Sequence, residues 1–133
     1  MTGIYIHVPF CKRKCPYCDF YSVCRPDLYE DYTQAVCRNI EAFKGRDIKC
    51  DTIYFGGGTP SVLSAEQVDR IIDTAGKCFA LCQPEITLEA NPSSVDREKM
   101  SGWRKAGVTR LSFGVQSAND RAVSYTHLRA HET

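Results

Sequence analysis

The sequence has little net charge, no long apolar run and no basic, apolar leader at its N-terminus. Lys and Arg total 17 against 16 Asp and Glu, a formal net charge of +1. This balance argues against a nucleic-acid partner, because a nucleic-acid-binding surface needs clustered basic residues. No segment approaches the roughly 18 apolar residues of a membrane span, and no secretion signal is present. We therefore expect a cytoplasmic protein without a membrane span.

The sequence also lacks the cysteine density of a disulfide-stabilised secreted domain. Its eight cysteines among 133 residues are too few for such a scaffold, and cytoplasmic thiols stay reduced. Hydrophobic residues at 43% and charged residues at 25% are the ordinary composition of one globular domain. Any cluster of cysteines is therefore better explained by metal binding than by disulfides.

Short runs of β-forming residues alternate with longer amphipathic stretches. Strands are predicted at residues 4–8, 52–55, 85–90 and 110–115, and helices at about 28–43, 65–79 and 97–106. Ser64 and Gln67 have the capping-box spacing, Asp96 is a candidate N-cap and Gly107 a candidate helix stop. This alternation predicts an α/β fold with parallel strands, either a doubly wound sheet or part of a (β/α) barrel.

Chemically distinctive residues stand where the predicted strands end. In both candidate folds the functional site lies at the carboxyl ends of the strands. The first strand runs into Cys11, the second into glycines 56–58, the third into Glu89 and Asn91, and the fourth into Gln116. We therefore expect these residues to share one edge of the sheet.

The cysteines Cys11, Cys15 and Cys18 follow the first strand in a C-x3-C-x2-C pattern. Three thiolates so closely spaced suit an iron–sulfur cluster, and a four-iron cluster with three protein ligands leaves one iron open to an external ligand. The cofactor whose radical chemistry uses such a centre is S-adenosylmethionine. A structural zinc site completed by His7 or Cys24 is the alternative that the spacing leaves open.

The segment CKRKCPYC, with FGGGTPS after the second strand, resembles the radical S-adenosylmethionine superfamily. IYIHVPFCKRKCPYCDF, IYFGGGTPS, EITLEANP and AGVTRLSFGVQS narrow the resemblance to the branch that contains oxygen-independent coproporphyrinogen III oxidase and the heme chaperone HemW. The resemblance implies a partial radical-type (β/α) barrel of about four strand–helix units with parallel strands. In that family an electron from the cluster cleaves S-adenosylmethionine and starts radical chemistry on a substrate.

The resemblance also implies a role for individual residues. Cys11, Cys15 and Cys18 would bind three irons of a [4Fe-4S] cluster. The residues implied to contact S-adenosylmethionine are Tyr5, Tyr17, Gly57, Gly58, Thr59, Glu89 and Gln116. Without the resemblance, Glu89 and Gln116 would be ordinary polar residues at strand ends, Tyr5 a core or half-buried strand residue, and the glycine run an ordinary turn.

One departure within the cysteine motif separates the two relatives. The oxidase carries a further cysteine two positions after the third, whereas this sequence has Phe20 there. The resemblance therefore favours a heme chaperone, with heme or a porphyrin as ligand and an apo-hemoprotein as target. The alternative is an oxidase that decarboxylates the propionate groups of coproporphyrinogen III, and no catalytic residue is assigned for it.

The resemblance covers roughly residues 4–121, and residues 1–121 are expected to be the N-terminal part of the family's core domain. Residues 122–133 are expected to be a non-family tail from truncation or a frameshift, and Arg129 in it does not stand in for the family's cofactor-binding arginine. With four strands the barrel is not closed, so the outer edge of the fourth strand is expected to be unpaired.

The remaining candidate residues have simpler explanations. His127 and His131 have an i, i+4 spacing but no acidic partner in a motif, and Trp103 is expected to pack in its helix. The other cysteines are expected to be small core residues or loop thiols: Cys24, Cys37, Cys50, Cys78 and Cys82.

Overall fold

The structure is a computed structural model that describes residues 1–10, 25–114 and 123–127. Its strands are β1 (Thr2–Val8), β2 (Lys49–Gly57), β3 (Ala80–Ala90), β4 (Arg110–Gly114) and β5 (Val123–His127). Its α-helices are α1 (Tyr29–Glu41), α2 (Ala65–Cys78) and α3 (Arg97–Ala106). Short 3-10 helices precede them at η1 (Pro26–Leu28), η2 (Pro60–Val62) and η3 (Pro92–Ser94). The predicted strands and helices are therefore present in the predicted order.

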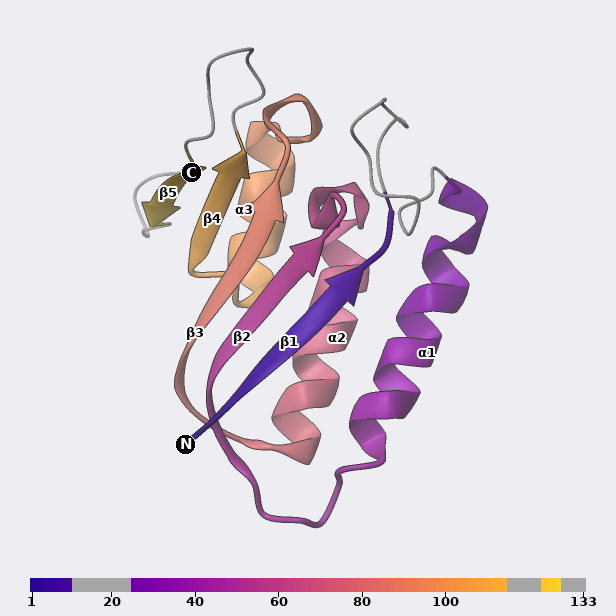
Figure 1. Cartoon of the computed structure of the whole chain (residues 1–133), viewed down its shortest axis with the longest axis vertical. Helices are drawn as coiled ribbons and strands as arrows, with labels where there is room; N and C mark the ends of the chain where they lie inside the picture. The colour runs from indigo at the N-terminus through magenta and orange to yellow at the C-terminus, as the bar shows by residue number, and fades with distance from the viewer. Residues whose placement is uncertain (11–24, 115–122, 128–133) are drawn as a thin grey trace.

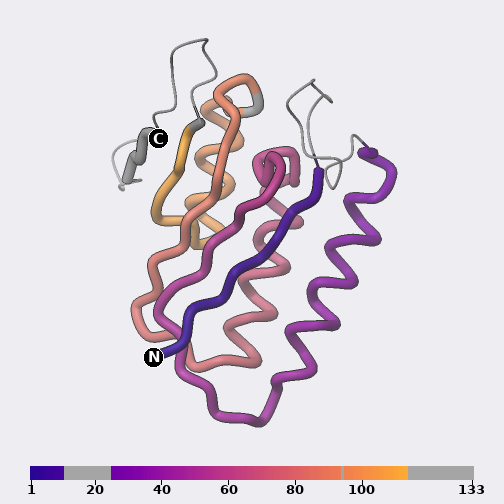
Figure 2. Tube along the Cα trace, in the orientation of Figure 1, coloured from indigo at the N-terminus to yellow at the C-terminus, as the bar shows by residue number. Residues whose placement is uncertain are grey.

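The strands form one sheet in the order β1-β2-β3-β4-β5, and β1 to β4 are parallel. The three α-helices cover the same face of this sheet (Figure 1). In Figure 2 the chain runs along each parallel strand toward one edge and returns through a helix. A doubly wound sheet would reverse its strand order and carry helices on both faces. The arrangement is therefore that of a partial (β/α) barrel, as the family resemblance predicted.

The outer edge of β4 differs from the prediction. It was expected to be unpaired, but β5 pairs with it in antiparallel orientation, from Arg110 opposite His127 to Gly114 opposite Val123. The segment VSYTH is rich in β-forming residues, and backbone pairing satisfies polar groups that an open edge would expose. The prediction of an unpaired edge was therefore wrong.

The sheet has one apolar face and one polar face. Side chains that point toward the helices alternate along each strand with side chains on the open face, as expected for a strand. The helix-facing residues include Val8, Phe55, Leu88 and Leu111, each with 0% of its surface exposed. Trp103 of α3 is also 0% exposed, which confirms its predicted packing role. The core thus lies between the sheet and the helices, and the open face is left for polar residues.

The helix starts follow from their capping residues. The Ser64 hydroxyl accepts a hydrogen bond from the Gln67 backbone N–H at 3.1 Å, and the Gln67 side chain accepts one from the Ser64 N–H at 3.0 Å. This is the predicted capping box of α2. Asp96 accepts a hydrogen bond from the Lys99 N–H at 2.7 Å at the start of α3, and Gly107 follows the last helical residue as predicted.

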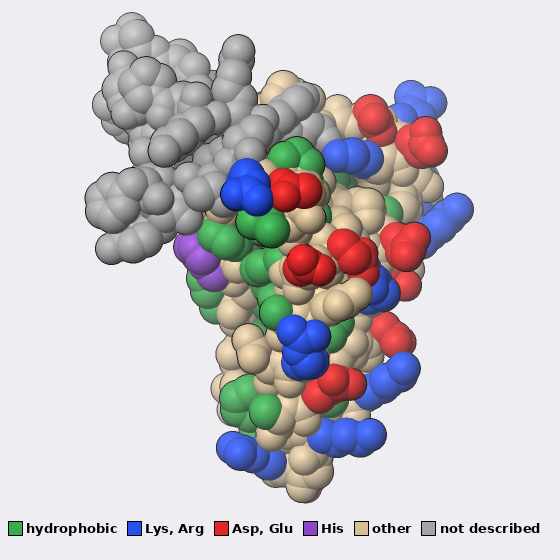
Figure 3. All heavy atoms as spheres, turned by 90° about the vertical axis from the view of Figure 1, so that its right-hand side faces the viewer, with side chains coloured by type: hydrophobic (Ala, Val, Ile, Leu, Met, Phe, Trp, Pro, Cys, Tyr) green, Lys and Arg blue, Asp and Glu red, His purple; other side chains and the backbone are tan. Residues whose placement is uncertain are grey.

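The surface seen from the side of α1 carries acidic and basic side chains interspersed with one another, with no large patch of one sign (Figure 3). This agrees with the formal net charge of +1. Of the helices in the described part of the chain, none has the length and apolar character needed to cross a bilayer.

Candidate functional site

The carboxyl edge of the parallel strands brings part of the predicted site together. Tyr5 lies on β1, Gly57 ends β2, Gly58 and Thr59 follow it, and Glu89 lies near the end of β3. The other predicted site residues lie outside the described residues: Cys11, Cys15, Tyr17, Cys18 and Gln116. The structure therefore places five of the ten predicted residues and leaves the cysteine motif untested.

Tyr5 lies on the open face, where 59% of its surface is exposed. Its strand register places it directly opposite Tyr54, and the two rings stack with centroids 6.0 Å apart and an interplanar angle of 14°. The alternative interpretation of Tyr5 as a core or half-buried strand residue is therefore wrong, because Tyr5 alternates with the buried Ile6 and lies on the exposed face. An exposed aromatic ring beside a second ring offers a flat apolar surface to a ligand on this face.

Glu89 is held by two hydrogen bonds that both come from β2. The Tyr54 hydroxyl donates to Glu89 Oε2 at 2.7 Å, and the Gly57 backbone N–H donates to Glu89 Oε1 at 3.1 Å. A carboxylate has about four lone-pair positions, so these bonds leave about two for a ligand that carries hydroxyl or ammonium donors. The side chain is half-buried and its orientation is fixed before any ligand binds.

The charge of Glu89 also affects the neighbouring tyrosine. The pKa of Tyr5 is raised above its ordinary value, first by burial and then by repulsion between a tyrosinate and the Glu89 carboxylate. Tyr5 therefore keeps its proton over the physiological range, and its neutral hydroxyl lies 3.5 Å from His7 Nδ1.

The glycine loop after β2 is bound directly to the end of β1. Gly58 N–H donates to the Val8 carbonyl at 2.8 Å, and Thr59 N–H donates to the Phe10 carbonyl. A Cβ on residue 58 would lie 2.4 Å from the Phe10 carbonyl oxygen, so only glycine permits this approach. Because Phe10 precedes Cys11 in the sequence, the loop fixes the backbone from which the cysteine motif departs.

Helix α1 supports the same end of β1 from the core side. The Phe10 ring is 3% exposed and lies 4.8 Å from the Tyr29 ring and 5.3 Å from the Tyr32 ring, measured between centroids. The Tyr32 hydroxyl donates a hydrogen bond to the His7 carbonyl. Burial raises the pKa of Tyr32 well above its ordinary value, so the hydroxyl keeps the proton that it donates.

The remaining cysteines of the described chain are free thiols, and the prediction that they are core or loop residues is wrong for Cys82, which is exposed on β3. Cys50 and Cys78 are buried, Cys37 is half-buried and Cys82 is exposed, while Cys24 lies outside the described residues. Burial is the main cause that raises the pKa of Cys50, which makes it an unreactive core thiol. Within the described ranges, no group of three His, Cys, Asp or Glu could hold a metal ion.

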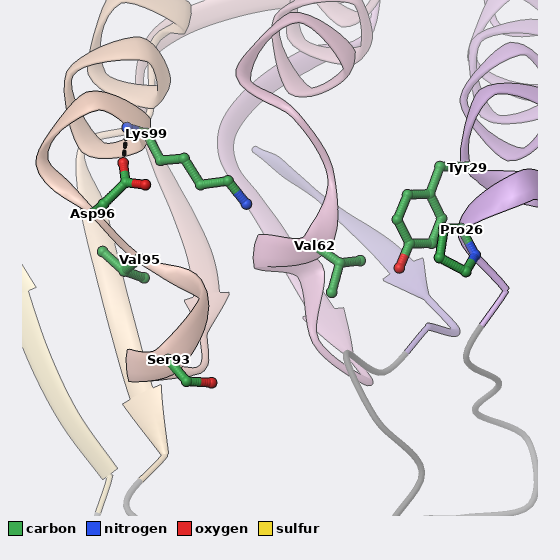
Figure 4. A pocket seen from close by; sticks show the side chains of 7 residues that line it. All are labelled: Pro26, Tyr29, Val62, Ser93, Val95, Asp96 and Lys99. Atoms are coloured by element: carbon green, nitrogen blue, oxygen red, sulfur yellow. Dashed lines mark hydrogen bonds between the residues drawn. The ribbon is translucent and has the colours of Figure 1, made fainter.

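Two features of this region were missed from the sequence. One is Tyr54, whose place just before the glycine run was its only signal. The other is a pocket of about 420 Å³ among the helix starts, lined by Pro26, Tyr29, Val62, Ser93, Val95, Asp96 and Lys99 (Figure 4). Lys99 Nζ donates to the Ser61 carbonyl at 3.2 Å across this region. None of the predicted site residues lines the pocket.

The fold defines an α/β protein of the partial-barrel class, in which Tyr5, Glu89 and the glycine loop lie together at the carboxyl edge of the sheet. The chain belongs to the radical S-adenosylmethionine (radical SAM) superfamily, because the sequence profile of that superfamily matches residues 5–132. This family implies a [4Fe-4S] cluster and S-adenosylmethionine as cofactors.

Individual relatives agree with this assignment. The chain is 40% identical over 125 residues to heme chaperone HemW of Escherichia coli K12, covering 89% of this chain and 32% of that protein. It is 39% identical over 127 residues to HemW of Bacillus subtilis 168, and the match covers 90% of this chain and 33% of that protein. It is 37% identical over 124 residues to anaerobilin synthase of Escherichia coli O157:H7, and the match covers 89% of this chain and 28% of that protein. The chain thus spans about a third of the length of the curated relatives it matches.

A solved structure supports the fold. The coproporphyrinogen III oxidase HemN from Escherichia coli, described as a radical SAM enzyme, superimposes with a TM-score of 0.71 at 31% sequence identity. The match covers 88% of this chain and 28% of that protein. It therefore places the described sheet and helices within the radical SAM fold.

The described residues fit the cofactor that the family implies. Tyr5 offers an exposed ring, Glu89 offers free carboxylate lone pairs, and the backbone at Gly57 and Gly58 comes close to the end of β1 because neither residue has a side chain. These groups suit a ligand with a planar base, hydroxyls and an ammonium group.

Proposed function

We propose that this chain carries the cluster-binding and cofactor-binding part of a heme chaperone similar to HemW. The observation that carries the proposal is the similarity to HemW proteins of distant bacteria, at 40% identity to the Escherichia coli protein and 39% to the Bacillus subtilis protein. The Phe20 position supports it further, because the oxidase-type motif has a cysteine there.

In this proposal Cys11, Cys15 and Cys18 hold three irons of the [4Fe-4S] cluster, and the fourth iron stays open to the cofactor. S-adenosylmethionine is contacted by Tyr5, Tyr17, Gly57, Gly58, Thr59, Glu89 and Gln116. When bound, the pair of cofactors supplies one-electron chemistry that can start a radical reaction.

Each described residue has a distinct physical part in this site. Glu89 accepts hydrogen bonds from the sugar hydroxyls or the ammonium group of the cofactor through the lone pairs that Tyr54 and Gly57 leave free. Tyr5 covers one side of the ligand with its ring. The backbone at Gly57 and Gly58 supports the methionine part, and the lack of side chains there lets this loop lie directly against the end of β1.

Heme or a porphyrin is the proposed cargo, and an apo-hemoprotein is the proposed target. The similarity to the HemW proteins supports this part of the proposal. Cytoplasmic location is proposed with this role.

A second candidate function is that of an oxygen-independent coproporphyrinogen III oxidase, which the likeness to the HemN structure favours. The two candidates differ in their chemical outcome. An oxidase converts propionate side chains of a porphyrinogen to vinyl groups, whereas a chaperone holds heme and transfers it unchanged.

Electron paramagnetic resonance on the anaerobically reconstituted and reduced chain tests the cofactor site. We expect a cubane signal that shifts on addition of S-adenosylmethionine. Cys15→Ala should remove this signal, while the matched control Cys82→Ala, which replaces an exposed free thiol, should retain it. Zinc in place of iron, or unchanged iron in Cys15→Ala, would contradict the cluster assignment.

Heme transfer then separates the two functions. The reconstituted chain is loaded with heme and mixed with an apo-hemoprotein, and the absorption spectrum of the acceptor is followed. Transfer without porphyrinogen turnover supports the chaperone. Conversion of coproporphyrinogen III without heme transfer would contradict it and support the oxidase.

A further inference from the structure

The hydrogen bond between Tyr54 and Glu89 crosses diagonally from β2 to β3. The register pairs Tyr54 with Thr87, so Glu89 lies two residues farther along β3 toward the carboxyl edge. Neighbouring strands lie about 4.8 Å apart and two residues rise about 6.6 Å, so such diagonal neighbours stand about 8 Å apart, a span that a long aromatic side chain reaches and a short polar one does not. The 2.7 Å contact from the Tyr54 hydroxyl therefore depends on both the length of the ring and its terminal oxygen.

The surroundings of Tyr54 fix the direction of its ring. Tyr5 stacks against it on β1, with ring planes only 14° from parallel. Gly56 leaves the space that the two rings use, because a Cβ on residue 56 would lie 2.9 Å from Tyr54 Cε1 and 2.8 Å from the Tyr5 hydroxyl. The hydroxyl of Tyr54 is thus directed at Glu89 by packing as well as by the hydrogen bond.

The consequence for Glu89 is a carboxylate with one orientation. A glutamate side chain at a strand end ordinarily samples several rotamers, and a ligand that binds it must restrict them. Here Oε2 is bound by Tyr54 and Oε1 by the Gly57 N–H, both from the same neighbouring strand. The remaining lone pairs therefore point away from β2 and are available in a fixed direction.

We propose that Tyr54 is a positioning residue of the S-adenosylmethionine site: its hydroxyl holds the Glu89 carboxylate in the orientation that receives hydrogen-bond donors of the cofactor. This inference rests on the proposed function, in which Glu89 contacts the cofactor. Tyr54 acts through Glu89 and does not itself need to touch the ligand.

The first test is a double-mutant cycle on the anaerobically reconstituted 133-residue chain. Tyr54→Phe keeps the ring and its stack on Tyr5 but removes the hydroxyl. The dissociation constant for S-adenosylmethionine, measured by equilibrium dialysis, should rise about tenfold, the effect of losing one hydrogen bond to a charged group. In a Glu89→Ala background the same change should have less than about a twofold effect, because no side chain is left at position 89 for Tyr54 to orient.

The second test needs no cofactor. In a chain labelled with ¹³C at the glutamate side-chain carboxyls, Glu89→Gln identifies the Glu89 resonance by its disappearance. That resonance should shift in Tyr54→Phe, because the carboxylate loses a donor, while the resonances of Glu41 and Glu66 on the helices should stay in place.

Three results would overturn the inference. These are unchanged cofactor affinity in Tyr54→Phe, an equal loss of affinity with and without Glu89, and an unshifted Glu89 resonance. The first two, in a chain that binds the cofactor, leave the proposed function standing. Failure of the unsubstituted chain to bind S-adenosylmethionine would refute the proposed function and the positioning role together, and the carboxyl spectrum would then still report whether the contact exists.

Discussion

Alanine at position 57 tests how closely the glycine loop is pressed against the end of β1. Gly57 has a φ of 111°, where an L-residue is strained by about 1–2 kcal/mol. Its Cβ would also lie 2.8 Å from His7 Cε1 and 2.9 Å from the Val8 carbonyl oxygen, and overpacking of this kind costs about 1–3 kcal/mol. We therefore expect Gly57→Ala to lower the free energy of unfolding by about 2–5 kcal/mol.

Two other glycines separate the contributions to this loss. Gly45 has a φ of 86°, but no atom lies within 4 Å of the position that a Cβ would take there. Gly45→Ala should therefore lower the free energy of unfolding only by the backbone strain of about 1–2 kcal/mol. Gly76 lies inside α2, where a Cβ would make an ordinary 3.6 Å contact with Leu81 Cδ1. Gly76→Ala should therefore raise the free energy of unfolding by about 0.5–1 kcal/mol through helix propensity.

The assay is urea denaturation of all three variants beside the unsubstituted chain, followed by far-ultraviolet circular dichroism. The urea concentration at the midpoint of unfolding should fall most for Gly57→Ala, fall less for Gly45→Ala and rise for Gly76→Ala. The dependence of the unfolding free energy on urea concentration should be the same in all of them. Equal losses in Gly57→Ala and Gly45→Ala would refute the reasoning, because they would leave no steric contribution from His7 and Val8.

Three further predictions concern the described side chains. Glu89→Gln should lower the pKa of Tyr5 part of the way toward its ordinary value, because it removes the carboxylate charge but leaves the burial, and tyrosine titration by absorbance measures this. Tyr32→Phe should lower the free energy of unfolding by about 1–2 kcal/mol, because the His7 carbonyl loses its donor. Burial raises the pKa of Tyr32 in the folded state above that in the unfolded state, so the contribution of Tyr32 to stability is complete below about pH 10 and is lost as the pH rises above that. Urea denaturation of Tyr32→Phe at several pH values should no longer show this loss of stability. Ser64→Ala should destabilise the chain by about 1 kcal/mol in the same assay through loss of the capping box of α2.

Helix boundaries were the part of the fold that the sequence predicted best, because capping is local. Ser64 with Gln67, Asp96 and Gly107 each act within one turn of a helix end, so their meaning does not depend on distant residues. Strand lengths were predicted less well. The second strand was predicted at 52–55 and extends over Lys49–Gly57, since strand ends are set by pairing with neighbours and not by composition alone.

The candidate site also contains residues that the sequence indicated and one that it did not. The family resemblance indicated Tyr5, Glu89 and the glycine loop, and the structure brings them to one edge. It did not indicate Tyr54, which looks like one more aromatic residue in a β-rich run, because its importance lies in a partner 35 positions away. The boundary at residue 121 and the roles of Cys11, Cys15 and Cys18 remain predictions, since these positions lie outside the described ranges.

The register of β2 against β3 is decided far from the functional edge. Between the first and later pairs, β2 advances from Cys50 to Thr52 while β3 advances from Leu81 to Glu85. The additional β3 residues include Gln83, whose φ of 45° is in the left-handed region that non-glycine residues rarely adopt. A bulge of this kind sets which side chains of two strands stand opposite each other.

That distant irregularity determines whether Tyr54 and Glu89 can meet. At the irregularity β3 advances four residues while β2 advances two, so without it Tyr54 would stand opposite Glu85. Glu89 would then lie on the same face but four residues farther along β3, beyond the reach of the Tyr54 hydroxyl. No sequence motif of the site indicates this register, because the residues at the irregularity are not themselves site residues. The glycine loop and the glutamate could therefore be found from the sequence, but the contact that orients the glutamate could be found only from the register of the folded sheet.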